Sequence, residues 1–587
     1  MTGCMMHEPS YRSGSYINED LGLYAGWVCH GDSFADCMPV MNAGKDIVLL
    51  FYGENFVDGS VIERLKKQGH EADRSNAGYL VHLYEEDPVN FFQLLNGYFS
   101  GVVVDLREGK IVLFNDRYRM GRVYYHQGEE DFIFSSEAKS LLKVRPELRE
   151  IDHEGLGQFF AWDCVLEEKT LFKDIFLLPG GSRWTFAGGS VPEKRTYFHP
   201  NEWENRPVLG KDAFYDRLTE TFANILPRYF DDLDRIAMSV SSGLDTRAIL
   251  ACIDVEPGQL PCHTFSGIHR ETLDAIIARK IAKAWHQPHE VLRLGRDFLS
   301  RFDEFSAKTV YVTDGCLNVN GSYDIYFNEL LRNIRPVRMT GKFGSEIVRS
   351  HSMLRKPFAF PEEVFHPDFK GHFDAAVEKL DENRKCHRLT FAAFKEIPWN
   401  EYGRLSMEMS KLTVRTPYMD NDLVELMYQA PPGERDTLEI SLRLVDHGNP
   451  ALRRIMTDRG TAGQNGYYFS NLSRLYHYYL VKSEYMYLWQ IPNWLARIDS
   501  ILSPLHPEKL FTGRHQLGSY RLWYRDELSD HIRSVLLDSR TKSRPYLNRS
   551  FLEKMIDTHT RGHANYTGEI NKILSAELIH RQLVEDI

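Results

Sequence analysis

The sequence lacks the features that mark membrane, secreted and disulfide-rich proteins. None of its apolar runs approaches the ~18 residues that a membrane-spanning helix needs. Its start has no basic segment followed by an apolar stretch, which a secretory signal would show. The eight cysteines contain no C-x-x-C pair and are few for 587 residues. We therefore expect reduced thiols, a cytoplasmic location and no membrane partner.

Positive charge is also scarce. Lysine and arginine total 71 against 82 aspartate and glutamate residues, so the formal net charge is −11. A chain with this average field repels phosphate-rich polymers, and we expect no nucleic-acid partner. The sequence also lacks a G-x-x-x-x-G-K-[ST] loop, which excludes the phosphate cradle of kinase- and GTPase-type proteins.

The composition is that of a folded, multidomain chain. Hydrophobic residues make up 43%, charged residues 26% and aromatic residues 12% of the sequence. Short β-rich runs with turn residues between them dominate the first third, at 47–52, 101–106, 110–114, 123–126, 132–135 and 182–186. Helical stretches interrupt them at 61–69 and 78–95. Strands in hairpins with a few helices predict an α+β layered domain of antiparallel sheets.

After a polar linker at 201–210, strands and helices alternate. We predict strands at 235–240, 262–265 and 337–340, and helices at 246–253 and from Leu273, where apolar residues recur at three- and four-residue steps. This alternation predicts an α/β doubly wound parallel sheet, in which ligands bind at the carboxyl ends of the strands.

Beyond residue 460 the chain is rich in aromatic and aliphatic residues at helical spacing. Leu475, Tyr478, Tyr479 and Val481 are typical of a helix packed into a core. We therefore predict three units, at residues 1–200, 210–460 and 461–587, the last a helical extension of the second.

One segment between a predicted strand and a predicted helix carries the chemistry. In Ser239-Val-Ser-Ser-Gly-Leu-Asp-Thr246, a tight Ser/Gly turn directs backbone N–H groups and hydroxyls toward the positive end of the helix dipole. Such a site suits a phosphate or pyrophosphate. Asp245 would repel that anion unless Mg²⁺ lay between them. The alternative is that Ser242 or Asp245 only caps the helix.

This loop resembles the S-G-G-x-D-S pyrophosphatase loop of the asparagine synthetase family, with Ser242 replacing one glycine and Thr246 the last serine. Similar family motifs follow in order. They are Cys262-His-Thr-Phe-Ser-Gly267, Met339-Thr-Gly-Lys-Phe-Gly-Ser-Glu346, which is similar to S-G-x-G-x-D-E, and Arg415-Thr-Pro-Tyr-Met-Asp-Asn-Asp-Leu-Val424. The first third resembles a class II glutamine amidotransferase domain, through Asn115-Asp-Arg-Tyr118, Phe134-Ser-Ser-Glu-Ala-Lys139 and Leu178-Pro-Gly-Gly181.

The resemblance implies a fold and a reaction. It implies an Ntn-type layered domain followed by an adenine nucleotide α-hydrolase-like sheet. It further implies that ATP adenylates a carboxylate, aspartate by default, that pyrophosphate leaves, and that an amine or ammonia then displaces AMP. Mg²⁺ and protein cations would neutralise the departing pyrophosphate. The implied partners are a small carboxylate and a nitrogen donor, with a peptide substrate and a homodimer as further options.

The resemblance also assigns residues to roles. ATP and pyrophosphate would contact Val240, Ser241, Ser242, Gly243, Asp245, Thr246, Gly267, Thr340 and Gly341. Ungapped alignment places Ser345 where the family has its second aspartate, and we favour Glu346 beside it as the second Mg²⁺ ligand with Asp245. The alternative for Glu346 is a helix-start glutamate near the dipole. The family lysine is missing, since no lysine occurs between Lys411 and Lys482. We expect Arg443, Arg453 or Arg454 to replace it, or Lys342 of the second loop.

The amidotransferase half departs further from its family. Thr2 takes the place of the nucleophilic cysteine, and is a weaker nucleophile once Met1 is removed. The glutamine-binding N-G-E becomes Tyr52, Gly53 and Glu54, and the aspartate of S-D-x-E becomes Asn76. We therefore expect a relic or a weak glutaminase.

Three functions remain open from the sequence. The first is an asparagine synthetase-like ligase that takes nitrogen from glutamine or ammonia. The second uses an internal amine, as in the β-lactam synthetase and lasso-peptide cyclase branches, and the changes at Thr2, Tyr52 and Asn76 favour it. The third is a non-catalytic binding protein on the same fold.

Overall fold

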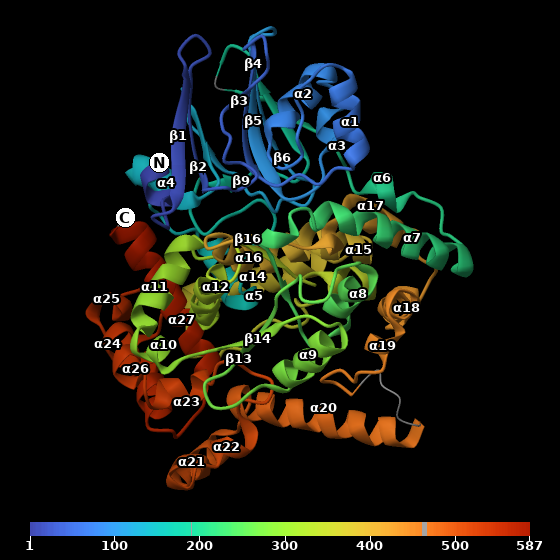
Figure 1. The fold of residues 1–587 in the computed structure, drawn as a ribbon. Coiled ribbons are helices and arrows are strands. Elements are labelled where there is room, and N and C mark those ends of the chain that lie inside the picture. Colours follow the sequence, from blue (N-terminus) through green and yellow to red (C-terminus); the bar gives the residue numbers. More distant parts are fainter. Residues whose placement is uncertain (190, 461–466, 587) are drawn as a thin grey trace.

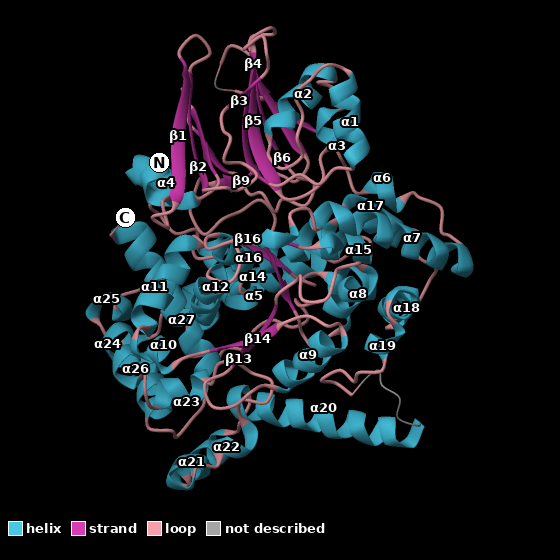
Figure 2. Cartoon of the chain, viewed as in Figure 1, coloured by secondary structure: helices cyan, strands magenta, loops and turns pink. Residues whose placement is uncertain are grey.

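A computed structural model describes residues 1–189, 191–460 and 467–586. In Figure 1 the N-terminal strands stand above a body of helices around a second sheet, with the C-terminal helices at its lower edge and one side. Figure 2 shows the two groups of strands separated by loops and helices. Within the described ranges, none of the helices combines the length and apolar character needed to cross a membrane.

The first domain is built around a six-stranded antiparallel sheet. Its order is β11-β10-β6-β5-β4-β3, formed by β3 (Val40–Met41), β4 (Ile47–Gly53), β5 (Phe99–Asp105), β6 (Lys110–Asn115), β10 (Ser182–Phe186) and β11 (Glu193–Thr196). Alternate residues face opposite sides, because successive side chains of a strand point in opposite directions. Leu49 and Val103 face the helices, whereas Val48 and Val102 face a second layer of strands.

That second layer contains a hairpin and a small sheet. The hairpin pairs β1 (Tyr11–Asn18) with β2 (Leu23–His30), and the sheet has the order β8-β7-β9, from β7 (Tyr124–Gln127), β8 (Phe132–Ser135) and β9 (Phe176–Leu177). Helix α4 (Ala138–Val144) packs against β7 and β8. Helices therefore cover both outer faces of two layers of strands, which confirms the predicted α+β layered fold. The hairpin lies outside the predicted strands.

The helical stretch predicted at 78–95 is two helices. Helix α1 (Gly59–Lys67) precedes α2 (Gly78–Glu86), and α3 (Phe91–Leu94) follows after a break at Asp87. The residue after Asp87 is Pro88, which disfavours helical backbone at the position before it. The prediction of one continuous helix was therefore wrong.

The second domain is a five-stranded parallel sheet of order β14-β13-β12-β15-β16. Its strands are β12 (Ile236–Ser239), β13 (Cys262–Ser266), β14 (His289–Arg293), β15 (Val337–Met339) and β16 (Thr413–Arg415). The chain runs outward from β12 through β13 to β14 and then returns to β15 on the other side. This reversal creates a crevice at the carboxyl ends of β12 and β15, where such sheets bind ligands. The predicted doubly wound sheet is confirmed.

Helices surround this sheet and continue to the end of the described chain. Around the sheet lie α7 (Lys211–Tyr229), α8 (Leu244–Cys252), α9 (Leu273–Ala284), α11 (Phe302–Val312), α12 (Ser322–Arg332), α13 (Gly344–Arg349), α14 (Pro367–Asn383), α16 (Tyr402–Met409), α17 (Asn421–Tyr428) and α18 (Glu439–Gly448). The predicted C-terminal helical region contains α20 (Tyr467–Trp489), α21 (Asn493–Ile501), α23 (Tyr520–Arg525), α24 (Ser529–Leu536), α26 (Arg549–Thr560) and α27 (Thr567–Ile579).

The prediction that the aromatic residues of α20 pack into a core was wrong. Leu475, Tyr478 and Tyr479, expected in a core, are 51%, 56% and 61% exposed. In Figure 1 the helix extends along the outside of the body. Helical spacing alone predicts which residues share a face, but it does not say whether another element covers that face.

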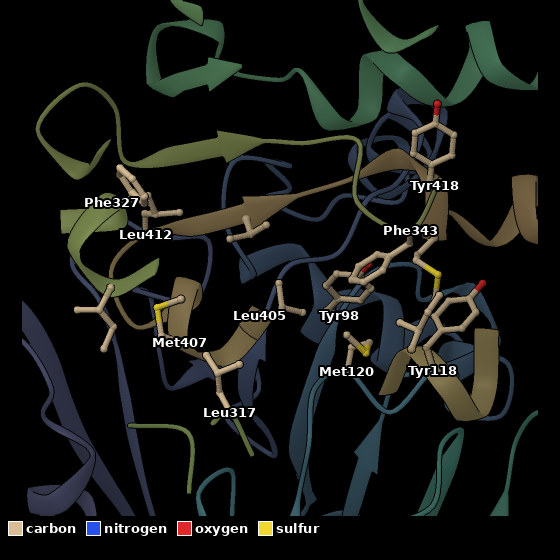
Figure 3. Close-up of a cluster of buried hydrophobic side chains, with 14 of the residues drawn as sticks. Tyr98, Tyr118, Met120, Leu317, Phe327, Phe343, Leu405, Met407, Leu412 and Tyr418 are labelled. Atoms are coloured by element: carbon tan, nitrogen blue, oxygen red, sulfur yellow. The ribbon is translucent and has the colours of Figure 1, made fainter. Parts of the chain in front are cut away.

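The two domains share one hydrophobic core. Figure 3 shows Tyr98, Tyr118 and Met120 of the first domain among Phe343, Leu405 and Tyr418 of the second. The rings of Tyr98 and Phe343 meet edge to face with centroids 6.5 Å apart. Since Phe343 belongs to the loop after β15, the first domain supports the second loop of the candidate site.

Candidate functional site

The loop after β12 begins the candidate nucleotide site. Val240 leaves the strand, and Gly243 stands before α8 in an extended conformation with φ −68° and ψ 175°. The Ser242 N–H donates to Asp274 Oδ1 over 2.6 Å, and the Gly243 N–H donates to Ser241 Oγ over 3.3 Å. Helix α8 starts at Leu244, so Asp245 lies in its first turn, at the positive end of the helix dipole.

A buried arginine fixes the same loop from behind. The Arg247 guanidinium is fully buried and donates to the carbonyl oxygens of Ser242, at 2.8 Å, and Leu452, at 3.2 Å. Burial lowers the pKa of Arg247 to about 10, which leaves it charged at neutral pH. Arg247 therefore ties the loop after β12 to the segment that follows α18.

The loop after β15 is in direct contact with the loop after β12. A Cβ on Gly341 would lie 2.6 Å from the Thr246 backbone nitrogen, and a Cβ on Gly344 would lie 2.7 Å from Asp245 Cβ. Thr340, also assigned to the nucleotide, donates its N–H to the Arg415 carbonyl over 3.0 Å. The predicted residues of the two loops are thus in contact, as the switch point of the sheet requires.

Asp245 is the centre of this contact. Its Oδ2 atom accepts hydrogen bonds from Arg349 Nη2 at 2.6 Å and from Ser345 Oγ at 3.0 Å. Its Oδ1 atom is buried and accepts no hydrogen bond from the described residues. Burial raises the pKa of Asp245 above its ordinary value, and the Arg349 charge opposes that shift. The Tyr418 hydroxyl donates to the Asp245 carbonyl over 2.7 Å and fixes the backbone.

Glu346, in the first turn of α13, carries the second carboxyl group that was predicted to bind Mg²⁺. Burial, together with the negative charges of Glu401, Asp245 and Glu396, raises the pKa of Glu346 to about 8. The pKa of a carboxyl group rises in this way when no cation compensates its negative charge. The free Asp245 Oδ1 and the Glu346 carboxyl are oxygen donors of the kind that Mg²⁺ prefers, so the residues present fit a divalent ion.

Gly267, assigned to the adenine side, lies after β13 against the C-terminal region. A Cβ on Gly267 would lie 3.1 Å from the Leu517 carbonyl oxygen. The loop that carries Leu517 is held by Glu484 of α20, whose carboxylate accepts the backbone N–H groups of Arg514 at 3.1 Å and His515 at 2.7 Å. The C-terminal extension therefore forms one wall beside this end of the sheet.

Of the cations predicted to replace the family lysine, Lys342 lies in the second loop and Arg443 lies away from both loops. Arg443 is on the surface, where it donates to Glu439 over 2.8 Å and lies 4.1 Å above the Tyr215 ring. Lys342 of the second loop pairs with the buried Glu408 over 2.9 Å. The structure does not bring Arg443 to the loops; the arginine that reaches Asp245 is Arg349.

The residues predicted to bind glutamine divide between two clefts, one within the first domain and one between the two domains. Tyr52 lines both, Thr2 lines the cleft within the first domain, and Gly53 and Glu54 line the cleft between the domains. Glu54 is paired with Arg415 of β16, whose Nη2 lies 2.6 Å from Glu54 Oε1.

Asn76 is separate from this group. Its side chain accepts the Gly78 N–H over 2.8 Å at the start of α2.

Sequence reasoning missed Arg349 and Asp274, which contact the loops. Arg349 lies four residues after Ser345, which places both side chains on one face of α13. Asp274 occupies the first turn of α9. The Arg349 spacing was visible in the sequence, whereas the Asp274 contact depends on how β12 and α9 are placed.

Comparison with known proteins agrees with this architecture. A glutamine amidotransferase domain matches residues 30–198. The glutamine-hydrolysing asparagine synthetase 2 of Bacillus subtilis is 25% identical over 402 residues, which are 63% of this chain and 50% of that protein. A putative asparagine synthetase 2 of Methanocaldococcus jannaschii is 22% identical over 318 residues, 51% of this chain and 58% of that protein. The chain is therefore similar to asparagine synthetases over much of its length and to a glutamine amidotransferase domain in its first third.

The similarity to these asparagine synthetases is distant. The chain spans about half the length of the curated relatives it matches, at 50% and 58%. Asparagine synthetase 1 of Arabidopsis thaliana is 31% identical over 138 residues, 23% of this chain and 24% of that protein. A solved glutamine phosphoribosylpyrophosphate amidotransferase of B. subtilis aligns over 63% of this chain and 81% of its own at 11% identity, with a TM-score of 0.24, too low to support an argument.

Proposed function

We propose that the chain is an ATP-dependent ligase that adenylates a carboxylate and forms an amide. One observation carries the proposal: the loops after β12 and β15 meet at Asp245, beside the start of α8. That arrangement suits a pyrophosphate, because backbone N–H groups, hydroxyls and a helix dipole converge on it. Residues 1–200, 210–460 and 461–587 would be its amidotransferase-like domain, synthetase domain and helical extension.

The reaction proceeds in two steps. A carboxylate oxygen attacks the α-phosphorus of ATP, the bond to the β-phosphate breaks and pyrophosphate leaves. An amine nitrogen then attacks the acyl carbon, the bond to the phosphate oxygen breaks and AMP leaves. Adenylation is needed because carboxylate oxygen is a poor leaving group. Asp245 and Glu346 would hold Mg²⁺, which neutralises the charge of the phosphates when it is bound.

The chain's own residues have defined tasks in this scheme. Ser241, Ser242, Gly243 and Thr246 bind pyrophosphate, and Val240, Gly267, Thr340 and Gly341 flank the nucleotide. Gly341 and Gly344 permit the close approach of the two loops. Lys342 is held by Glu408 at the edge of the second loop and is a candidate for neutralising acyl-phosphate charge.

A second candidate keeps the adenylation and changes the nitrogen donor. Glu54 is engaged by Arg415, and Asn76 starts a helix, so neither is free to bind the amino group of glutamine. These contacts favour free ammonia, or an amine of the substrate itself, over glutamine.

The test is the exchange of labelled pyrophosphate into ATP with aspartate and a panel of other acids. We expect exchange with at least one acid, lowered about 100-fold or more by Asp245→Ala, because that change removes a group at the phosphates. Asp254→Ala, at an exposed position, is the matched control. Exchange with aspartate supports amide formation from aspartate, and exchange with another acid alone supports the second candidate. No exchange with any acid would contradict the proposed function.

A further inference from the structure

The helix that follows the second loop, α13, carries a positively charged side chain that contacts the first loop. Arg349 ends α13, and its Nη2 atom lies 2.6 Å from Asp245 Oδ2 and 2.5 Å from Ser345 Oγ. Ser345 donates to the same Asp245 oxygen over 3.0 Å. The three side chains bond to one another, and Asp245 Oδ2 accepts a hydrogen bond from each of the other two.

The charges of this group differ from those of a site with two carboxylates. Position 345 aligns with an aspartate of the family motif but carries a neutral hydroxyl. Two carboxylates facing each other repel unless a cation or a shared proton lies between them. Asp245 with Ser345 carries a single negative charge, and the Arg349 guanidinium balances it. The chain therefore supplies at this position a positive charge that would otherwise come from a metal ion.

Arg349 also has unused bonding capacity. Its Nε atom is buried and has no hydrogen-bond partner among the described residues, and the same is true of Asp245 Oδ1. The side chains of Arg349 and Asp245 as a whole keep 19% and 16% of their surface exposed. A guanidinium with a free N–H suits a phosphate oxygen, because its planar fork binds phosphates with directed hydrogen bonds.

We propose that the Arg349 side chain supplies a permanent positive charge in the pyrophosphate site. It binds the departing pyrophosphate directly and reduces the number of divalent ions that the loops themselves must hold. Asp245 Oδ1 and Glu346 remain for one ion, and Arg349 with Ser345 takes the place of further metal ligands. This inference rests on the proposed function, because it assumes that the loops bind pyrophosphate.

The experiment titrates the full-length protein with inorganic pyrophosphate in a calorimeter, once with EDTA and once with Mg²⁺. We expect binding in EDTA, weakened about tenfold or more by Arg349→Gln and less by Arg349→Lys, which keeps the charge and loses the fork. Arg388→Gln is the matched control, since Arg388 is exposed and pairs with Asp436 in the same domain. It should bind as the wild type does.

A second measurement uses Mn²⁺ without nucleotide, followed by electron paramagnetic resonance. The double variant Ser345→Asp, Arg349→Gln should bind Mn²⁺ about tenfold or more tightly than the wild type, because it adds a carboxylate and removes the competing charge. This gain cannot arise from a misfolded variant.

The outcomes separate the inference from the proposed function. Pyrophosphate binding in EDTA that Arg349→Gln leaves unchanged, or a double variant without tighter Mn²⁺ binding, overturns the inference. Wild-type binding that occurs only with Mg²⁺ also overturns the inference and leaves the proposed function standing. A wild type that binds neither pyrophosphate nor ATP, with or without Mg²⁺, overturns both.

Discussion

Two glycines determine how closely the loops after β12 and β15 approach each other. Gly341 and Gly344 leave room for Thr246 and Asp245, whose atoms a Cβ would meet at 2.6 and 2.7 Å. Separations below about 3 Å force the backbone to move, and a rigid, close-packed interior resists such movement. The geometry of Asp245 thus depends on residues that have no side chain.

We predict that Gly341→Ala separates the loops and weakens the binding of ATP. The expected loss of stability is about 1–3 kcal/mol, the usual cost of overpacking. Denaturant unfolding and a titration with Mg²⁺-ATP measure the two effects. Gly371→Ala in α14 is the control, because nothing lies within 4 Å of its Cβ position. It should be neutral or stabilising, since alanine is the better helix former. Equal effects of the two changes would refute this account of the loops.

At the scale of elements, buried carboxylates fix turns and helix starts. Asp116 is fully buried after β6 and accepts the backbone N–H groups of Tyr118 at 2.9 Å and Gly121 at 2.6 Å. Burial outweighs these hydrogen bonds and raises the pKa of Asp116 to about 6. The folded state therefore favours the protonated form more than the unfolded state does.

The sign of this shift gives a pH dependence. The stabilising contribution of Asp116 is fully present below pH 3.8, the ordinary pKa, and is lost as the pH rises to about 6. We compare the free energy of unfolding of the wild type with that of Asp116→Asn. We predict that the difference, wild type minus variant, falls by about 1–3 kcal/mol between pH 4 and pH 7. Chemical denaturation at several pH values measures it. A difference that rises with pH would contradict the assigned shift.

The sequence predicted most elements of both sheets, because their apolar patterns are strong and turn residues separate them. Predicted strand 47–52 became β4, and 262–265 became β13. The hairpin of β1 and β2 was missed, since polar residues and glycines interrupt its apolar pattern; Gly14 is required there because the Trp27 ring packs on it.

The candidate site was predicted in part. Motif spacing identified both loops, and strand order explains why they meet. The pairing of Glu54 with Arg415, and of Asp245 with Arg349, joins residues 361 and 104 positions apart. A single sequence does not show which distant charges come together, so the contact between Arg349 and Asp245 was not among the predictions, which named Arg443, Arg453, Arg454 and Lys342.

At the scale of the whole molecule, charged pairs and a shared core join the two domains. Arg415 pairs with Glu54 and also donates to the Tyr229 and Asp231 carbonyls, both at 3.1 Å. The side chains of Arg415 and Glu54 are only 14% and 13% exposed. Glu54 of the first domain thus pairs with Arg415 of the second across the domain boundary.

We predict that Glu54→Ala destabilises the protein by about 3–5 kcal/mol, because it leaves the Arg415 charge buried and unpaired. Glu193→Ala removes one partner of an exposed pair with Arg195 and should cost about 0–1 kcal/mol. Thermal and denaturant unfolding compare the two variants. A cost for Glu54→Ala no larger than that for Glu193→Ala would show that the pair does not hold the domains together.

The most direct test of the account follows an oxygen atom. The protein is incubated with Mg²⁺-ATP, ammonia and an acid that supports pyrophosphate exchange, labelled with ¹⁸O in its carboxylate, and the AMP is analysed by mass spectrometry. Adenylation predicts AMP that carries one ¹⁸O atom, because the carboxylate oxygen that attacked the α-phosphorus leaves with it. Unlabelled AMP, or ADP with labelled phosphate, would contradict the central claim that this chain activates a carboxylate as its adenylate.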